Sequence, residues 1–97
     1  MALTVVVTRD VEARYRGFLA SVMLEIAPGL YVSPRMSAGV RARVWSVLTR
    51  WHDVLGRGSL VMVWRDPAAV GELQIETLGE PPKTIVDADG VLLVKRK

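Results

Sequence analysis

A cluster of charged residues directly follows the first apolar segment of the chain. Leu3–Thr8 is continuous and rich in β-branched residues, and Arg9, Asp10, Arg14 and Arg16 come within the next eight positions. Such runs form buried strands, and open α/β sheets often bind their ligands beyond the carboxyl ends of strands. The carboxylate could hold a metal ion, and the guanidinium groups could hold phosphate. This combination favours a nucleotide or a nucleic acid as the ligand.

Asp10 has two interpretations. It could be a ligand of Mg²⁺, which proteins usually hold through one or two carboxylates together with waters and phosphate oxygens. One carboxylate per chain is too few for such a site, although two copies facing each other across a dimer axis would supply a pair. The residue chemistry favours the alternative, in which Asp10 is the N-cap of the following helix. The fixed positive charge of Arg9 also opposes a bound cation.

Arg14 and Arg16 fall in the first turns of the predicted helix, outside its apolar stripe. Helix positions two apart point about 200° away from each other, so the pair cannot grip one phosphate but could flank a groove or reach both strands of a duplex. The planar arginine fork suits phosphate, and a solvated helix face is the alternative. Arg41 and Arg43 on the second helix could likewise bind phosphate or form a solvated face, and here the solvated face is favoured more strongly. Arg41 nevertheless stays among the candidate nucleic-acid-binding residues.

The remaining residues that could do chemistry have simpler structural explanations. His52 is the only histidine and lies beside Asp53, with no serine, cysteine or second histidine to complete a catalytic set. The three tryptophans are expected to pack, and Trp45 falls beside the apolar stripe, where it could meet a partner subunit. The glycines form no phosphate-binding loop of the G-x-G-x-x-G or G-x-x-x-x-G-K type.

Apolar periodicity predicts two helices. The first carries one apolar face, made of Val11, Tyr15, Phe18, Leu19 and Val22. The second is expected to begin after Ser37 as its N-cap and to end at Gly56 and Gly58. Its stripe is Val40, Val44, Val47, Leu48, Trp51 and Leu55.

The segments between and after the helices predict strands. These are Leu3–Thr8, then Met23–Ala27 and Leu30–Val32 around a Pro28-Gly29 turn, then Leu60–Trp64, Glu72–Leu78, Thr84–Val86 and Val91–Val94. Pro34 is expected to break the chain, Asp66-Pro67 and Asp89-Gly90 to form turns, and Pro81-Pro82 to exclude regular structure. Five consecutive apolar residues in Leu60–Trp64 predict a strand buried on both faces, whereas the alternation in Glu72–Leu78 predicts a half-exposed strand.

This order of elements predicts the fold class. Strand, helix, two strands, helix and strand form an α+β, ferredoxin-like βαββαβ sandwich with extra C-terminal strands. We expect residues 1–97 to form a single domain, with a strand extension over about residues 71–97.

Composition bounds the possible partners. The chain has 97 residues, no cysteine, a net charge of +3 and 51% apolar residues. The apolar share is high for so small a domain and favours coverage of one face by a second subunit, so we expect a homodimer. The first apolar run is short and has no basic lead, and no apolar stretch approaches the roughly 18 residues of a membrane helix. We therefore expect a cytoplasmic protein that does not contact a membrane.

Taken in order, these residues resemble CRISPR-associated protein 2 of the type I-E branch. The resemblance runs from Val5 to Val94 and rests on the joint order and spacing of its markers. These are Val5-Val6-Val7-Thr8, Arg14-x-Arg16-Gly17, Leu24-Glu25, Gly29-x-Tyr31-Val32, Ser37-Ala38 with Arg41 and Trp45, Val61-Met62-x-Trp64, Gln74, Gly79, and Thr84-x-Val86-Asp87-x-Asp89-Gly90-x-x-Leu93-Val94.

The resemblance implies a ferredoxin-like homodimer that sits between two dimers of CRISPR-associated protein 1, the integrase. It further implies that this dimer sets the separation of the integrase pairs and holds the backbone of a captured DNA duplex. By position, Arg14 and Arg16 match residues that contact DNA phosphate. Lys83 matches one of two adjacent basic residues in a later loop, the other being Pro82 here. Integrase docking falls on the C-terminal strand, made of Val91, Leu92, Leu93 and Val94, although Lys95-Arg96-Lys97 replaces a more apolar ending.

The resemblance also implies an alternative function. Many relatives are described as metal-dependent endonucleases, acting on RNA or DNA through an aspartate just after the first strand. Asp10 matches that catalytic and metal-binding residue when the alignment is anchored on Asp10-Val11. Anchored on Val5–Thr8 instead, the acidic position falls on Arg9. Mg²⁺ is therefore an expected cofactor only for the nuclease alternative, and the bridging role needs none.

Overall fold

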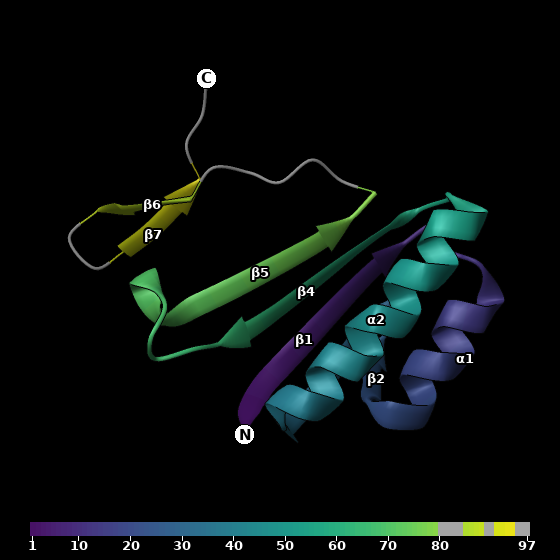
Figure 1. The fold of residues 1–97 in the computed structure, drawn as a ribbon, viewed down its shortest axis with the longest axis horizontal. Coiled ribbons are helices and arrows are strands. Elements are labelled where there is room, and N and C mark those ends of the chain that lie inside the picture. Colours follow the sequence, from purple (N-terminus) through teal and green to yellow (C-terminus); the bar gives the residue numbers. More distant parts are fainter. Residues whose placement is uncertain (80–84, 89–90, 95–97) are drawn as a thin grey trace.

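The computed structural model describes residues 1–79, 85–88 and 91–94. Its elements, drawn in Figure 1, are β1 (Ala2–Arg9), α1 (Ala13–Val22), β2 (Leu24–Ala27), β3 (Leu30–Met36), α2 (Ala38–Leu55), β4 (Ser59–Arg65), the 3₁₀ turn η1 (Val70–Glu72), β5 (Leu73–Leu78), β6 (Ile85–Ala88) and β7 (Val91–Val94). The order from β1 to β4 confirms the predicted β-α-β-β-α-β sequence. Within the described ranges, neither helix is long and apolar enough to cross a membrane.

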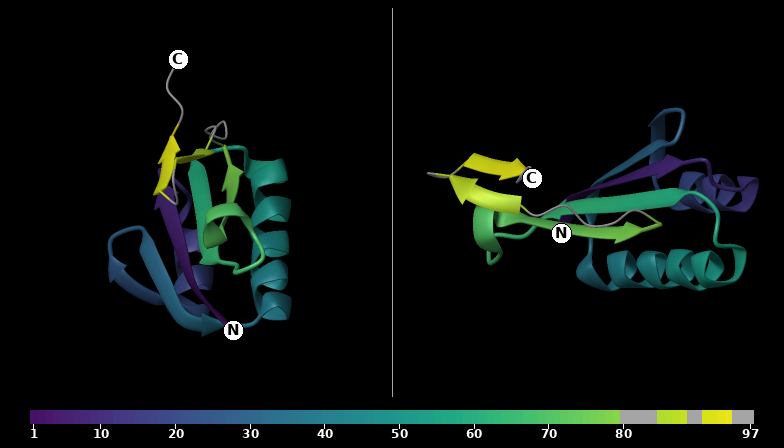
Figure 2. Two further views of the ribbon diagram at one scale, coloured as in Figure 1. Left: turned by 90° about the vertical axis from the view of Figure 1, so that its left-hand side faces the viewer. Right: turned by 90° about the horizontal axis from the view of Figure 1, so that it is seen from above.

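The strands form two antiparallel sheets. The larger has the order β2-β3-β1-β4-β5, with β1 at its centre, and the smaller pairs β6 with β7. In the larger sheet Val6 lies opposite Tyr31 on β3 and Met62 on β4. The arrangement of its first four strands and two helices is ferredoxin-like. Figures 1 and 2 show the β6–β7 hairpin at the opposite end of the molecule from α1.

Both helices pack on one face of the larger sheet. The buried core joins side chains from β1, β3 and β4 to side chains from α1 and α2: Val6, Tyr31, Leu60, Met62, Tyr15, Leu19, Val44 and Leu48. Most of the two predicted helix stripes therefore points inward, but Val11 lies before α1 begins, and Val22 and Val40 are 41% and 46% exposed. Alternate residues of the same strands point to the other face, where no described helix lies.

The prediction that Leu60–Trp64 is buried on both faces was wrong, because the helices cover only one face of the sheet. Leu60 and Met62 are buried beneath the helices, but Val61 and Val63 are only partly buried. The continuous apolar run is therefore not a strand buried on both faces within one chain. Its second set of apolar side chains lies on the uncovered face of the sheet.

β5 also places apolar side chains on the uncovered face, because its polar side chains lie on the face that the helices cover. Gln74 and Glu76 lie opposite Trp64 and Met62, so they share the face on which the helices pack. Ile75 lies opposite Val63 on the uncovered face, where it is 40% exposed. The predicted alternation is confirmed, and its apolar side faces away from the helices.

Two local predictions were wrong. The N-cap of α1 is Glu12 and not Asp10, and its side chain makes no capping hydrogen bond. Asp10 instead has a left-handed φ of 56°, because the chain turns sharply between β1 and α1. Pro34 does not break the chain, since β3 continues to Met36. The register of β1 with β3 shifts between Ala2 and Thr4, opposite this part of β3, and such irregularities accommodate proline.

The ends of α2 were predicted correctly because they depend on local chemistry. The Ser37 hydroxyl accepts a hydrogen bond from the Val40 N–H at 3.2 Å. Gly56 closes the helix in the left-handed region, with its N–H donating to the His52 carbonyl. These two caps fix the length of the helix that carries Trp45 and Trp51.

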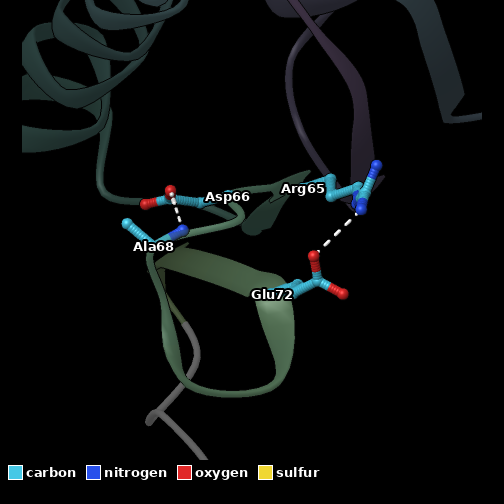
Figure 3. Close-up of polar contacts among 4 residues, drawn as sticks. All are labelled: Arg65, Asp66, Ala68 and Glu72. Carbon is cyan, nitrogen blue, oxygen red and sulfur yellow. Dashed lines mark hydrogen bonds and ion pairs between the residues drawn. The ribbon is translucent and has the colours of Figure 1, made fainter.

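The connection from β4 to β5 is a tightly bonded turn (Figure 3). Arg65 and Glu72 form an ion pair at 2.9 Å, and the Asp66 carboxylate accepts the Ala68 N–H at 3.0 Å. Gly71 within η1 has a φ of 69°, and a Cβ there would collide with the Leu92 side chain of β7. The absence of a side chain at Gly71 thus lets the C-terminal hairpin approach this turn.

We predict that Tyr15→Phe stabilises the protein. The Tyr15 hydroxyl is buried and has no hydrogen-bond partner among the described residues, so its removal relieves a desolvation penalty of about 1 kcal/mol.

Burial raises the pKa of Tyr15, Glu12 raises it further, and Arg14 partly offsets this. A raised folded-state pKa stabilises the protein fully below the unfolded value of 10.0, and this stabilisation is lost as the pH rises through the folded-state pKa. Urea unfolding at pH 7 and pH 10.5 should show a larger advantage for Tyr15→Phe at the higher pH. A variant less stable than the parent at both pH values would contradict this account.

Candidate nucleic-acid interface

Four element ends meet at the predicted charged site. Arg9 at the end of β1 pairs with Ser59 at the start of β4, which places the C-terminal end of α2 beside the N-terminal end of α1. The site therefore contains Arg9, Asp10, Arg14 and Arg16, as the sequence predicts, and also Arg57. Arg9, Asp10, Arg14 and Arg16 are all exposed.

Asp10 is held by Arg57. The guanidinium donates to the carboxylate at 3.0 Å, and both side chains are more than half exposed. The Asp10 hydrogen bond and negative charge raise the pKa of Arg57. The backbone is tight here as well, since a Cβ at Gly58 would lie 2.7 Å from the Arg9 carbonyl oxygen and still closer to that of Asp10. The aspartate is thus fixed in both backbone and side chain.

The donor set around Asp10 does not fit a metal centre within one protomer. No cluster of three or more histidine, aspartate or glutamate side chains occurs in the described ranges. Asp10 is paired with Arg57 and stands next to Arg9, and Glu12 is the one other carboxylate close by. A divalent cation would have to displace one guanidinium and approach another, with at most two carboxylates to hold it. The arrangement of charge therefore suits an anion better than a cation.

Arg14 and Arg16 lie on opposite sides of α1. The Arg14 guanidinium carbon lies 5.6 Å from the centre of the Trp51 ring, on the side of α1 that meets α2. Arg16 lies near Tyr31 on β3 and Glu25 on β2. Burial and then Glu25 raise the pKa of Tyr31, and the charge of Arg16 partly offsets this. The two arginines therefore extend the positive surface in two directions, in keeping with their helical spacing.

Arg41 is separated from this cluster. It lies ten residues before Trp51 on α2, or about 15 Å along the helix axis. Its guanidinium carbon lies 4.5 Å from the centre of the Trp64 ring. Both residues line a groove of about 350 Å³ between α2 and the β4–β5 edge, together with Ala38, Ala42, Trp45, Ser46, Met62 and Glu76. The structure does not bring Arg41 together with Arg14 and Arg16.

His52 has a structural role here. Its Nε2 atom lies 3.1 Å from the Gly58 carbonyl oxygen, which links the end of α2 to the start of β4. Lys83 lies outside the described residues. Of the predicted docking residues, Val91, Leu92, Leu93 and Val94 form β7, and Leu93 and Val94 are each 49% exposed.

Sequence reasoning missed Arg57 and the role of Trp51 in this site. Arg57 directly follows the glycine that ends α2, so it had to emerge at the same end of the sheet as Asp10. Pairing the end of β1 with the start of β4 would have revealed this neighbourhood. Trp51 packs as predicted, against Tyr15 and Phe18. Its contact with Arg14 was not predicted.

A comparison with protein families finds a match over most of the chain. The family described as CRISPR-associated protein (Cas_Cas2CT1978) matches residues 3–93. The chain belongs to the Cas2 family, type I-E subtype. Membership confirms the resemblance read from the sequence and is consistent with a role in spacer adaptation. It also implies partnership with Cas1 in that process.

We predict that Gly58→Ala is more destabilising than Gly56→Ala. Both glycines have a positive φ, so each substitution adds about 1 kcal/mol of backbone strain. A Cβ at Gly58 would also collide with the Asp10 backbone, whereas one at Gly56 would meet nothing within 4 Å. Thermal unfolding followed by circular dichroism should separate the two variants. Equal losses of stability would show that the close approach of Gly58 to Asp10 contributes nothing.

Proposed function

We propose that this chain is a non-catalytic DNA-binding subunit of CRISPR adaptation. In this proposal a homodimer bridges Cas1 integrase dimers and holds the backbone of the duplex that is to be inserted. Family membership supports the adaptation role. The DNA-binding part is carried by the exposed Arg14 and Arg16 at the start of α1, beside an aspartate whose charge is already matched by Arg57.

The uncovered face of the sheet supports the homodimer. Leu3 and Val7 on β1 and Ile75 on β5 lie on this face and are 40% or more exposed. Monomeric proteins rarely leave a continuous apolar sheet face in water. A second copy of the same face would bury these residues and double the number of arginines available to one ligand.

The charge distribution supports binding to the phosphate backbone. The first turn of α1 contains no acidic residue, and the four arginines near it (Arg9, Arg14, Arg16 and Arg57) outnumber the two nearby carboxylates, Asp10 and Glu12. Within the described ranges Arg14 and Arg16 form no ion pair within 4 Å, so their charges are available to phosphate. Contacts of this type read the backbone and not the base sequence.

The C-terminal hairpin is the proposed Cas1 docking element. β7 is paired on one side by β6, and it exposes apolar side chains at Leu93 and Val94. Its position at the far end of the molecule from α1 leaves the arginines free for DNA (Figure 2). One subunit could therefore contact the integrase and the duplex at the same time.

We predict that Val7→Glu dissociates the homodimer. A carboxylate in the centre of an apolar interface costs several kcal/mol, so the dimer dissociation constant should rise by about a hundred-fold or more. Val54→Glu is the matched control, because Val54 is 81% exposed on α2 and away from the sheet. Sedimentation equilibrium should find the control dimeric and Val7→Glu monomeric. A parent protein that is monomeric at high concentration would refute the dimer.

We predict that Arg14→Ala combined with Arg16→Ala weakens duplex binding and reduces its dependence on salt. The slope of log affinity against log salt should fall by about 0.9 for each phosphate that the variant no longer neutralises. Spacer uptake should be abolished. Arg35→Ala serves as the control, since this exposed arginine lies at the other end of the β1–β3 pair. Normal uptake by the double variant would remove these residues from the proposed function.

Asp10→Ala distinguishes the scaffold from the nuclease alternative in the same assays. The scaffold requires no carboxylate, so uptake should stay at the parental level. A Mg²⁺-dependent nuclease would instead lose cleavage of RNA or duplex DNA in this variant and in EDTA. Purified protein that cleaves neither substrate with Mg²⁺ or Mn²⁺ would leave the scaffold as the function.

A further inference from the structure

We propose that Trp51 is a positioning residue that orders Arg14 for its contact with DNA phosphate. The proposal rests on the proposed function, because it assumes that Arg14 meets the duplex. It adds a residue of α2 that does not itself touch DNA but sets the geometry of a residue that does.

The Trp51 ring is fixed by two aromatic contacts from α1. The rings of Tyr15 and Phe18 each lie 5.4 Å from it, centre to centre, at 86° and 71° to its plane. These are edge-to-face geometries, which aromatic pairs prefer. Tyr15 is completely buried in the core, so the orientation of Trp51 is tied to the packing of both helices.

Arg14 lies against this fixed ring. The distance of 5.6 Å from its guanidinium carbon to the ring centre is within the range of cation–π attraction. A guanidinium held against an aromatic ring keeps its charge and can still donate N–H bonds from the edge of its plane. An arginine ordered before binding loses less conformational entropy when it meets a phosphate.

Two of the three neighbouring arginines, Arg57 and Arg16, show how this arrangement differs from an ordinary one. Arg57 is held by the Asp10 carboxylate, which competes with phosphate for the same N–H groups. Arg16 lies near Glu25 and Tyr31, and no stacking partner is found for it in the described part of the chain. Trp51 therefore orders Arg14 without neutralising it, and its effect should be confined to that arginine.

A double-mutant cycle on the full-length protein tests this proposal. The readout is affinity for a short DNA duplex, measured by fluorescence anisotropy well below the melting temperature of every variant. Trp51→Leu should weaken binding by about two- to five-fold, the range expected for an exposed cation–π pair. In the Arg14→Ala background the same substitution should change affinity by less than half of that factor. In the Arg16→Ala background it should retain its full effect.

Trp51→Phe separates positioning from packing. Phenylalanine keeps an aromatic face, so it should recover part of the affinity that Trp51→Leu removes, and the recovery should disappear when Arg14 is alanine. A purely structural role would instead weaken binding equally in the Arg14→Ala and Arg16→Ala backgrounds. If Trp51→Leu folds poorly, the dependence of Trp51→Phe on Arg14 still decides between the two roles.

The outcomes also separate this proposal from the proposed function. If Arg14→Ala does not weaken duplex binding, the DNA contact assigned to Arg14 is wrong and the role of Trp51 falls with it. If Arg14→Ala weakens binding but the Trp51 variants bind like the parent, or bind less tightly whether or not Arg14 is present, the positioning role is overturned. DNA binding through Arg14 would then remain.

Discussion

The packing of both helices against a single face of the sheet is the constraint from which the other features follow. Tyr15 and Leu19 of α1 and Val44 and Leu48 of α2 bury that face and hold the helices next to each other. Because both helices are used there, the other side of each strand keeps its apolar residues uncovered. A small chain with this arrangement has its second hydrophobic surface available for a partner.

The same packing determines where charge collects. β1, α1 and α2 each contribute one end to the same region, so arginines distant in the sequence come together without a dedicated loop. One acid–base pair within this region cancels locally, between Asp10 and Arg57. What remains is a positive surface with backbone amides of a helix start beside it, which is a suitable environment for an extended polyanion and a poor one for a small cation.

Local chemistry explains which parts of the fold could be predicted. The Ser37 and Gly56 caps and the Pro28-Gly29 turn depend on a few adjacent residues, and each was predicted correctly. The helix stripes were correct except at Val11, Val22 and Val40. The predicted cap at Asp10 was wrong because the turn after β1 packs closely against Gly58, which is near it only in three dimensions. The break predicted at Pro34 was wrong because a shift in pairing with β1 accommodates the ring.

The candidate site was predictable to a similar extent. The exposure and divergence of Arg14 and Arg16 followed from helical spacing alone. Their surroundings did not, because the partners of Asp10 and Arg14 come from α2 and the segment after it. Which face of a strand is uncovered was equally inaccessible, since a run such as Leu60–Trp64 reads the same whether its second cover is a helix or another molecule.

The close approach of Gly71 to Leu92 links two segments that are far apart in the sequence. The connection between β4 and β5 thereby contacts β7, the last strand of the chain. Lengthening that loop, or giving its glycine a side chain, would redirect the C-terminal segment without altering any residue in it. The length of this short connection therefore helps to determine the angle between the larger sheet and the C-terminal hairpin.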